Sequence, residues 1–202
     1  MSILAGQRVR DLQSAKHRFA SSSKPAARVV LHLDAVLATV HEIITRRAPH
    51  QEEHKNLQKF LDWVDAERLM TLAVMADAAD ESLAIIRLFD SQYDPSNLAG
   101  ALAEFIHKLD VLFLQRQILE SPHTYSSYML RSLRRRPRLL RASTGVKSLG
   151  GPGCLEAEAM DRIFSHMAGW VRLCVKSLDA EFPDWEVLQA IIGHEDVARG
   201  AL

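Results

Sequence analysis

Apolar residues recur at helical spacing along most of this chain. Between residues 66 and 89 the apolar positions follow each other at intervals of three and four, and further apolar side chains fill the gaps between them. This spacing predicts a helix that is buried over much of its circumference. Aspartates precede the segment, so either Asp62 or Asp65 is expected to cap the helix.

The same spacing predicts several further helices. We expect them near residues 3–16, 26–47, 49–63, 98–119, 124–136, 155–181 and 185–192. Pro25 follows three serines and is expected to lie close to the start of its helix. Residues 137–153 are expected to be mostly loop, because Gly150, Gly151, Pro152 and Gly153 fall together there.

No window shows sustained alternation of apolar and polar residues with β-branched enrichment, so no sheet is expected. The predicted fold class is therefore all-α: a single helical domain over residues 1–202, with about seven or eight helices and a flexible joint near residues 142–153.

Composition narrows the classes of protein. Lysine plus arginine equals aspartate plus glutamate at 25 each, so no net charge draws the chain to nucleic acid or membrane and any electrostatic function must be local. The two cysteines, Cys154 and Cys174, are too few for a disulfide framework. No apolar run reaches the ~18 residues of a membrane span, and no signal peptide is recognised. These features predict a soluble intracellular protein, nuclear or cytoplasmic, without a membrane partner.

One histidine pattern was weighed as a zinc site. His50, Glu53 and His54 match the H-x-x-E-H arrangement, in which two histidines share a helix face and the carboxylate serves as general base. No third ligand and no strands accompany the pattern, so a polar first turn after Pro49 is the favoured interpretation. No phosphate-binding glycine loop and no nucleophile with a neighbouring base is found either. We therefore expect no catalytic residues, no metal, no cofactor and no enzyme.

The strongest charged feature is a cluster of arginines within eleven residues. Its members are Arg131, Arg134, Arg135, Arg136, Arg138 and Arg141. Guanidinium groups bind phosphates bidentately, and the preceding Tyr125 and Tyr128 are suited to stacking on bases. Two interpretations stay open: a surface that binds a polyanion such as DNA, or a solvated helix end. A second basic stretch near Lys16 and Lys24 favours the polyanion if the two meet in the fold.

Several segments in order resemble the helical region of hAT-superfamily transposases. They are Lys16–Ser21, which resembles an Arg-Trp-x-Ser signature with Phe19 in place of tryptophan, Leu72–Ala79, Phe105–Leu109, His166–Met167 and Glu181–Asp184. In that family the region is a helical insertion into a ribonuclease-H-like catalytic core. Because no strands are expected here, the resemblance implies a helical remnant rather than an active transposase, with Arg18 and Phe19 keeping part of the family's DNA contact.

The leading hypothesis is thus a non-catalytic helical protein that binds nucleic acid through the arginine cluster together with Arg18 and Phe19. The alternative is a helical protein–protein interaction module, in which the arginines have no nucleic-acid role.

Overall fold

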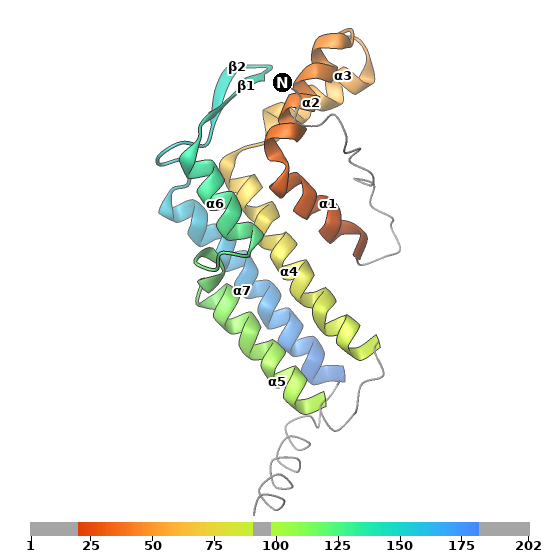
Figure 1. Cartoon of the computed structure of the whole chain (residues 1–202), viewed down its shortest axis with the longest axis vertical. Coiled ribbons are helices and arrows are strands. Elements are labelled where there is room, and N and C mark those ends of the chain that lie inside the picture. The colour runs from red at the N-terminus through yellow and green to blue at the C-terminus, as the bar shows by residue number, and fades with distance from the viewer. Residues whose placement is uncertain (1–19, 91–97, 182–202) are drawn as a thin grey trace, which may run out of the picture. The chain divides into compact units, whose positions relative to one another are not determined.

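The computed structural model describes residues 20–90 and 98–181 (Figure 1). Seven α-helices and one two-stranded sheet lie within these residues. Their bounds are α1 (Ala20–Leu31), α2 (Leu33–Arg46), α3 (Glu52–Trp63), α4 (Ala66–Asp90), α5 (Leu98–Leu109), α6 (Tyr125–Arg135), β1 (Arg138–Ala142), β2 (Gly145–Leu149) and α7 (Ala157–Glu181). A π-helical turn, η2 (Asp110–Leu114), and a 3₁₀ turn, η3 (Gln117–Leu119), follow α5. The predicted all-α class is confirmed.

Most predicted helices are found close to the expected bounds. The main backbone nitrogen at the start of α4, that of Arg68, donates to Asp65 Oδ1 at 2.8 Å, so Asp65 rather than Asp62 caps this helix. The helices expected near residues 3–16 and 185–192 lie outside the described residues.

The helix expected over residues 26–47 is wrong in two respects. It begins at Ala20, which places Pro25 inside α1, and it breaks at His32, whose ψ of 29° departs from helical values. At this break the Leu31 carbonyl accepts a hydrogen bond from the Tyr128 hydroxyl at 3.3 Å. A contact from a segment 97 residues away, which no local pattern reveals, thus accompanies the break.

The expectation of no sheet is also wrong. Residues 138–149, predicted as loop, form an antiparallel hairpin in which Ser143 and Thr144 alone connect β1 to β2. The proposed flexible joint near 142–153 therefore begins inside the hairpin. The buried face carries Leu140 and Leu149, whereas Leu139 and Val146 stay exposed on the other face. Apolar residues on both faces hide the alternation that would identify strands.

The glycines after β2 serve a close backbone approach. Gly151 N donates to Leu133 O at 2.7 Å, which satisfies a carbonyl in the last turn of α6. Gly150 has φ of +91°, and a Cβ there would stand 2.6 Å from Leu133 O. Only glycine fits this position without displacement of the backbone.

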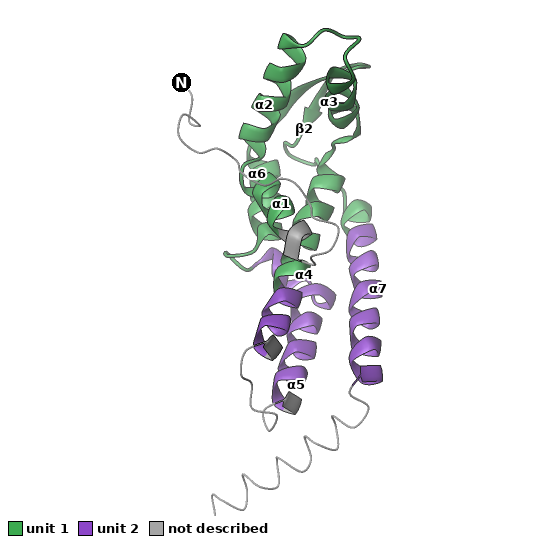
Figure 2. Cartoon of the chain, turned by 90° about the vertical axis from the view of Figure 1, so that its right-hand side faces the viewer, with its two compact units in different colours: residues 1–80, 121–160 green, residues 81–120, 161–202 purple. Residues whose placement is uncertain are grey.

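The chain divides into two compact units (Figure 2). The first comprises the described residues up to Asp80 and those of 121–160; the second comprises the described residues of 81–120 and from Asp161 onward. In the first unit the core includes Val30, Leu33, Val64, Met70, Val74, Met129, Leu133, Leu140 and Leu149. In the second it includes Leu102, Leu109, Phe113, Ile118, Ile163, Phe164 and Val171.

Asp77 fixes the start of α6 in the first unit. Its carboxylate accepts hydrogen bonds from Tyr125 N at 2.9 Å, Ser126 N at 2.8 Å and Ser126 Oγ at 2.6 Å. Thr124 Oγ1 adds a cap by accepting from Ser127 N. Because these bonds satisfy the free N–H groups of the first turn, they hold α6 against α4. They thereby set the position of the arginines at the other end of α6.

Candidate functional site

The arginine cluster spans the end of α6 and the start of β1. Arg131, Arg134 and Arg135 belong to α6, Arg136 is its C-cap, and Arg138 opens β1. Positive charge at this end is favoured because the last carbonyls of a helix carry partial negative charge. The fold therefore gathers these residues where their charge is tolerated without acidic neighbours along the same helix.

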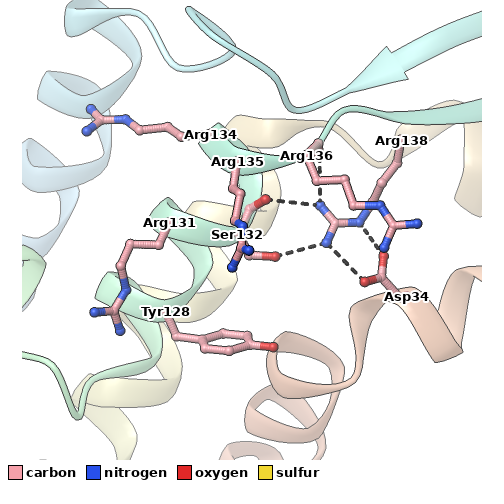
Figure 3. Close-up of a pocket in the computed structure, with 8 residues that line it drawn as sticks. All are labelled: Asp34, Tyr128, Arg131, Ser132, Arg134, Arg135, Arg136 and Arg138. Atoms are coloured by element: carbon pink, nitrogen blue, oxygen red, sulfur yellow. Dashed lines mark hydrogen bonds and ion pairs between the residues drawn. The ribbon is translucent and has the colours of Figure 1, made fainter. Parts of the chain in front are cut away.

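An open pocket of about 880 Å³ lies over this region. Its lining residues are Asp34, Tyr128, Arg131, Ser132, Arg134, Arg135, Arg136 and Arg138 (Figure 3). Five arginines thus share the pocket with a single carboxylate. The residues come from α2, α6 and β1, so the pocket is a product of the tertiary fold.

Arg138 is committed to the structure. Its Nε donates to Asp34 Oδ1 at 2.5 Å, and its Nη2 donates to Asp34 Oδ2 at 3.3 Å and to Ser132 Oγ at 2.9 Å (Figure 3). Its Nη1 also reaches the carbonyls of Ser132 and Arg136. The Arg138 side chain is only 10% exposed. This arginine therefore ties β1 to α2 and has little donor capacity left for a ligand.

Asp34 is neutralised by the same contact. The hydrogen bond and charge of Arg138, helped by the charge of Arg136, hold the pKa of Asp34 below its ordinary value. The carboxylate is thus ionised and its negative charge is already paired. It does not offset the positive charge of the remaining arginines.

The other four pocket arginines are exposed. Arg131 Nη2 donates to Pro122 O at 3.3 Å, and Figure 3 shows Arg131 and Arg134 extending to the side opposite Asp34. Among the described residues, the side chains of Arg134, Arg135 and Arg136 form no hydrogen bond or ion pair. The cluster predicted from sequence therefore divides into one structural arginine and a set of solvent-facing guanidinium groups.

Two of the other predicted contact residues lie elsewhere. Arg141 belongs to β1 but does not line the pocket. Arg18 and Phe19 lie outside the described residues, and so does Lys16. Lys24, from the second basic stretch, is an exposed residue of α1, and α1 packs against α6.

Tyr128 brings an aromatic ring to the pocket. The residue is 40% exposed and is held at its far end by the hydrogen bond from its hydroxyl to Leu31 O. Tyr125, in contrast, donates to Asp80 Oδ2 at 3.1 Å and does not line the pocket. Only one of the two tyrosines suggested by the sequence is therefore placed to stack on a ligand.

Sequence reasoning missed two pocket residues, Asp34 and Ser132. Asp34 lies 104 residues before Arg138, and nothing in its surroundings distinguishes it from other aspartates of helical segments. Ser132 is one of several serines near the cluster. Neither residue carries a local signal, so their roles follow only from the packing of α2 beside α6 and β1.

The histidine pattern near α3 does not form a metal site in the described structure. His54 Nδ1 lies 3.2 Å from both Ile44 O and Arg47 O, and Glu53 pairs with Arg47 at 3.0 Å. Because carbonyls only accept, His54 carries its proton on Nδ1 and donates it. In the described ranges no group of three or more histidine, cysteine or acidic side chains is arranged to hold a metal ion.

The cysteines are not activated. Burial raises the pKa of Cys154, although the charge of Arg134 opposes this shift, and burial raises the pKa of Cys174. Cys174 was expected in the core and is instead partly exposed. Both thiols are protonated near neutral pH, and a protonated thiol is a weak nucleophile.

Compared with known proteins, the chain matches no family model, no curated protein and no solved structure. The resemblance to hAT transposases therefore stays a prediction from the quoted residues. Among the helices that the structure describes, none combines the length and apolar character needed to cross a membrane.

Proposed function

We propose that this chain binds nucleic acid non-catalytically, through contacts between the phosphate backbone and the arginine pocket. The observation that carries the proposal is the charge of that pocket. Arg131, Arg134, Arg135 and Arg136 face solvent there, while the only carboxylate is already paired with Arg138. A ligand with several negative charges at fixed spacing complements such a surface.

Phosphodiesters fit this surface for two reasons. A guanidinium group matches two phosphate oxygens with parallel N–H donors, which gives both affinity and orientation. Each phosphate neutralised also releases condensed counterions, which favours binding at low salt. A lone anion would satisfy one arginine and leave the others unpaired.

Tyr128 adds a second type of contact. A ring that is partly exposed beside phosphate-binding arginines suits stacking with an unpaired base. The proposal therefore covers both duplex and single-stranded nucleic acid and treats the difference between them as a measured outcome.

The resemblance to the hAT insertion region supports the same proposal. The family handles DNA, and the segments that resemble it include Arg18 and Phe19, which we propose as an accessory contact. Arg141 is proposed as a peripheral phosphate contact, since it is exposed on β1 outside the pocket.

The test is fluorescence anisotropy of labelled duplex and single-stranded DNA across a salt series. Wild type is compared with the triple variant Arg134→Ala, Arg135→Ala, Arg136→Ala. The matched control is Arg87→Ala, Arg172→Ala, Lys176→Ala, which removes the same charge from exposed positions of the second unit. Because net charge is equal in the two variants, only the place of the lost charge differs.

We expect the pocket variant to lose affinity and to lower the slope of log affinity against log salt by about 3 for duplex DNA, or about one per lost contact. The control should keep the wild-type slope. Equal losses in both variants would show non-specific attraction and overturn the pocket assignment. Absence of binding at low salt would overturn the function and favour the protein-interaction module.

A further inference from the structure

The outer edge of β2 lacks a partner strand. Because Ser143 and Thr144 alone join the strands, Ala142 and Gly145 form the first hydrogen-bonded pair of the hairpin. The pairs Leu140–Lys147 and Arg138–Leu149 are then also hydrogen-bonded. In the alternate pairs, Arg141–Val146 and Leu139–Ser148, the main-chain N–H and C=O groups point outward, away from the partner strand.

The two edges of the hairpin differ in what covers them. On the β1 side, α3 packs against the strand, and the outward carbonyl of Arg141 accepts a hydrogen bond from Gln58 Nε2 at 3.2 Å. On the β2 side, no described residue bonds to the outward main-chain groups of Val146 or Ser148. The sheet has two strands within the described residues, so β2 is an open edge (Figure 1).

The usual protection of such an edge is absent. Edge strands commonly carry a lysine that discourages further pairing. Here Lys147 turns to the inner face, where its Nζ donates to the carbonyls of Asp62 at 2.8 Å and Val64 at 2.7 Å. The outer face instead carries Leu139 and Val146, which are 76% and 68% exposed. An open edge beside exposed apolar side chains is suited to strand addition.

The charge around the edge selects the partner. Arg141 lies directly across from Val146 on the outer face, and Arg134, Arg135 and Arg136 precede the hairpin. The neighbouring carboxylate of Asp62 is occupied by Ser143, whose N and Oγ donate to it at 2.6 and 2.8 Å. A second copy of the chain would bring like charges together, which disfavours self-pairing. An acidic partner is complementary.

We propose that the outer edge of β2 binds an extended acidic segment of a partner protein as a third strand. Its main chain pairs with the N–H and C=O groups of Val146 and Ser148. An apolar side chain of the segment packs on Val146 and Leu139, and a carboxylate meets Arg141. This interaction surface is independent of the proposed nucleic-acid function, because neither Val146 nor Ser148 lines the arginine pocket.

The test uses the full chain and a short fluorescein-labelled peptide of alternating glutamate and valine. A matched peptide carries N-methyl groups on alternate amides, which keeps the charge and blocks main-chain pairing. In the variant Ser148→Pro the outward N–H is removed, a change that an edge strand tolerates because this group bonds to nothing within the hairpin. Binding is followed by anisotropy and by amide NMR.

We expect the amide protons of Val146 and Ser148 to shift downfield on peptide addition, while that of Lys147, bonded within the hairpin, stays in place. N-methylation and Ser148→Pro should each weaken binding about tenfold, the loss expected for one or two main-chain hydrogen bonds. A slowly exchanging Lys147 amide in Ser148→Pro shows that the hairpin is intact.

Three outcomes overturn the proposal. One is the absence of binding at about 1 mM peptide, the weak end of specific association. Another is equal affinity for the N-methylated peptide, which would show capture by charge alone. The last is binding that leaves the Val146 and Ser148 amides unshifted, which would place the contact elsewhere.

Discussion

Arg138 and Asp34 form an ion pair across 104 residues of sequence, with Arg138 Nε 2.5 Å from Asp34 Oδ1. The pair is largely shielded on the arginine side, where the side chain is 10% exposed, while Asp34 remains 59% exposed. It joins the first strand of the hairpin to α2 and removes the only carboxylate of the pocket from competition with a ligand. One contact thus contributes both to the fold and to the charge of the proposed site.

Arg138→Ala is expected to destabilise the fold. It removes bonds to Asp34 and Ser132 and leaves a shielded site without its donor, so a loss of about 2–4 kcal/mol in the free energy of unfolding is predicted. Urea denaturation measures it. Arg134→Ala, at an exposed position, should stay within about 0.5 kcal/mol of wild type. Equal effects of the two substitutions would contradict a structural role for Arg138.

Asp34→Asn is expected to strengthen DNA binding. The substitution removes the negative charge from the pocket while an amide oxygen still accepts from Arg138. Exposed charge interactions are small, so we expect an increase in affinity of about two- to fivefold at low salt. Anisotropy titrations measure it, with Glu104→Gln as a control of equal charge change in the second unit. Equal gains in the two variants would show that only net charge matters.

Two carboxylates predict opposite dependences of stability on pH. The pKa of Asp34 is lowered by Arg138, so its contribution is present above the ordinary value of 3.8 and is lost as pH falls through the folded-state pKa. Burial raises the pKa of Asp77 despite the bonds from Ser126 and Tyr125, so stability is lost as pH rises from 3.8 through the raised pKa.

The difference in unfolding free energy between wild type and Asp34→Asn should therefore shrink as the solution is acidified below about pH 4. The difference between wild type and Asp77→Asn should shrink as pH rises above about 4. Urea unfolding over this range tests both. Curves of the same sign for the two variants would show that the pKa of one carboxylate is shifted the other way.

Gly150→Ala is expected to cost about 2–3 kcal/mol. A Cβ there would lie 2.6 Å from Leu133 O, and φ of +91° is strained for any other residue. Gly153 has φ of +75° but open space around it, so Gly153→Ala should cost about 1 kcal/mol. Thermal unfolding of both variants separates the clash from the backbone strain. A larger cost at Gly153 would be inconsistent with this account.

Zinc is not expected to stabilise the protein at the histidine pattern. The Nδ1 atom of His54 is occupied by the carbonyls of Ile44 and Arg47, and Glu53 pairs with Arg47. His54→Ala should lower stability by about 0.5–1.5 kcal/mol through loss of this donor. Melting temperatures with and without zinc, for wild type and for His50→Ala, provide the measurement. A zinc-dependent rise that disappears in His50→Ala would revive the metal site.

Sequence periodicity was sufficient to identify helices whose burial repeats along the chain. Leu69, Met70 and Ala73 of α4 fall on the pattern that predicted them, because a helix of this length must bury one stripe wherever it packs. The caps at Asp65 and Thr124 also follow from local hydrogen bonding. These properties depend on residues within a few positions of each other.

The hairpin, the helix break and the pocket depend on residues far apart. The hairpin has exposed Leu139 and Val146 on one face and buried Leu140 and Leu149 on the other, so its pairing leaves no alternating pattern to read. The arginines were recognised as a cluster from sequence alone. Which of them is consumed by Asp34, and which face solvent, was decided by tertiary packing, because an ion pair between α2 and β1 exists only once those elements meet.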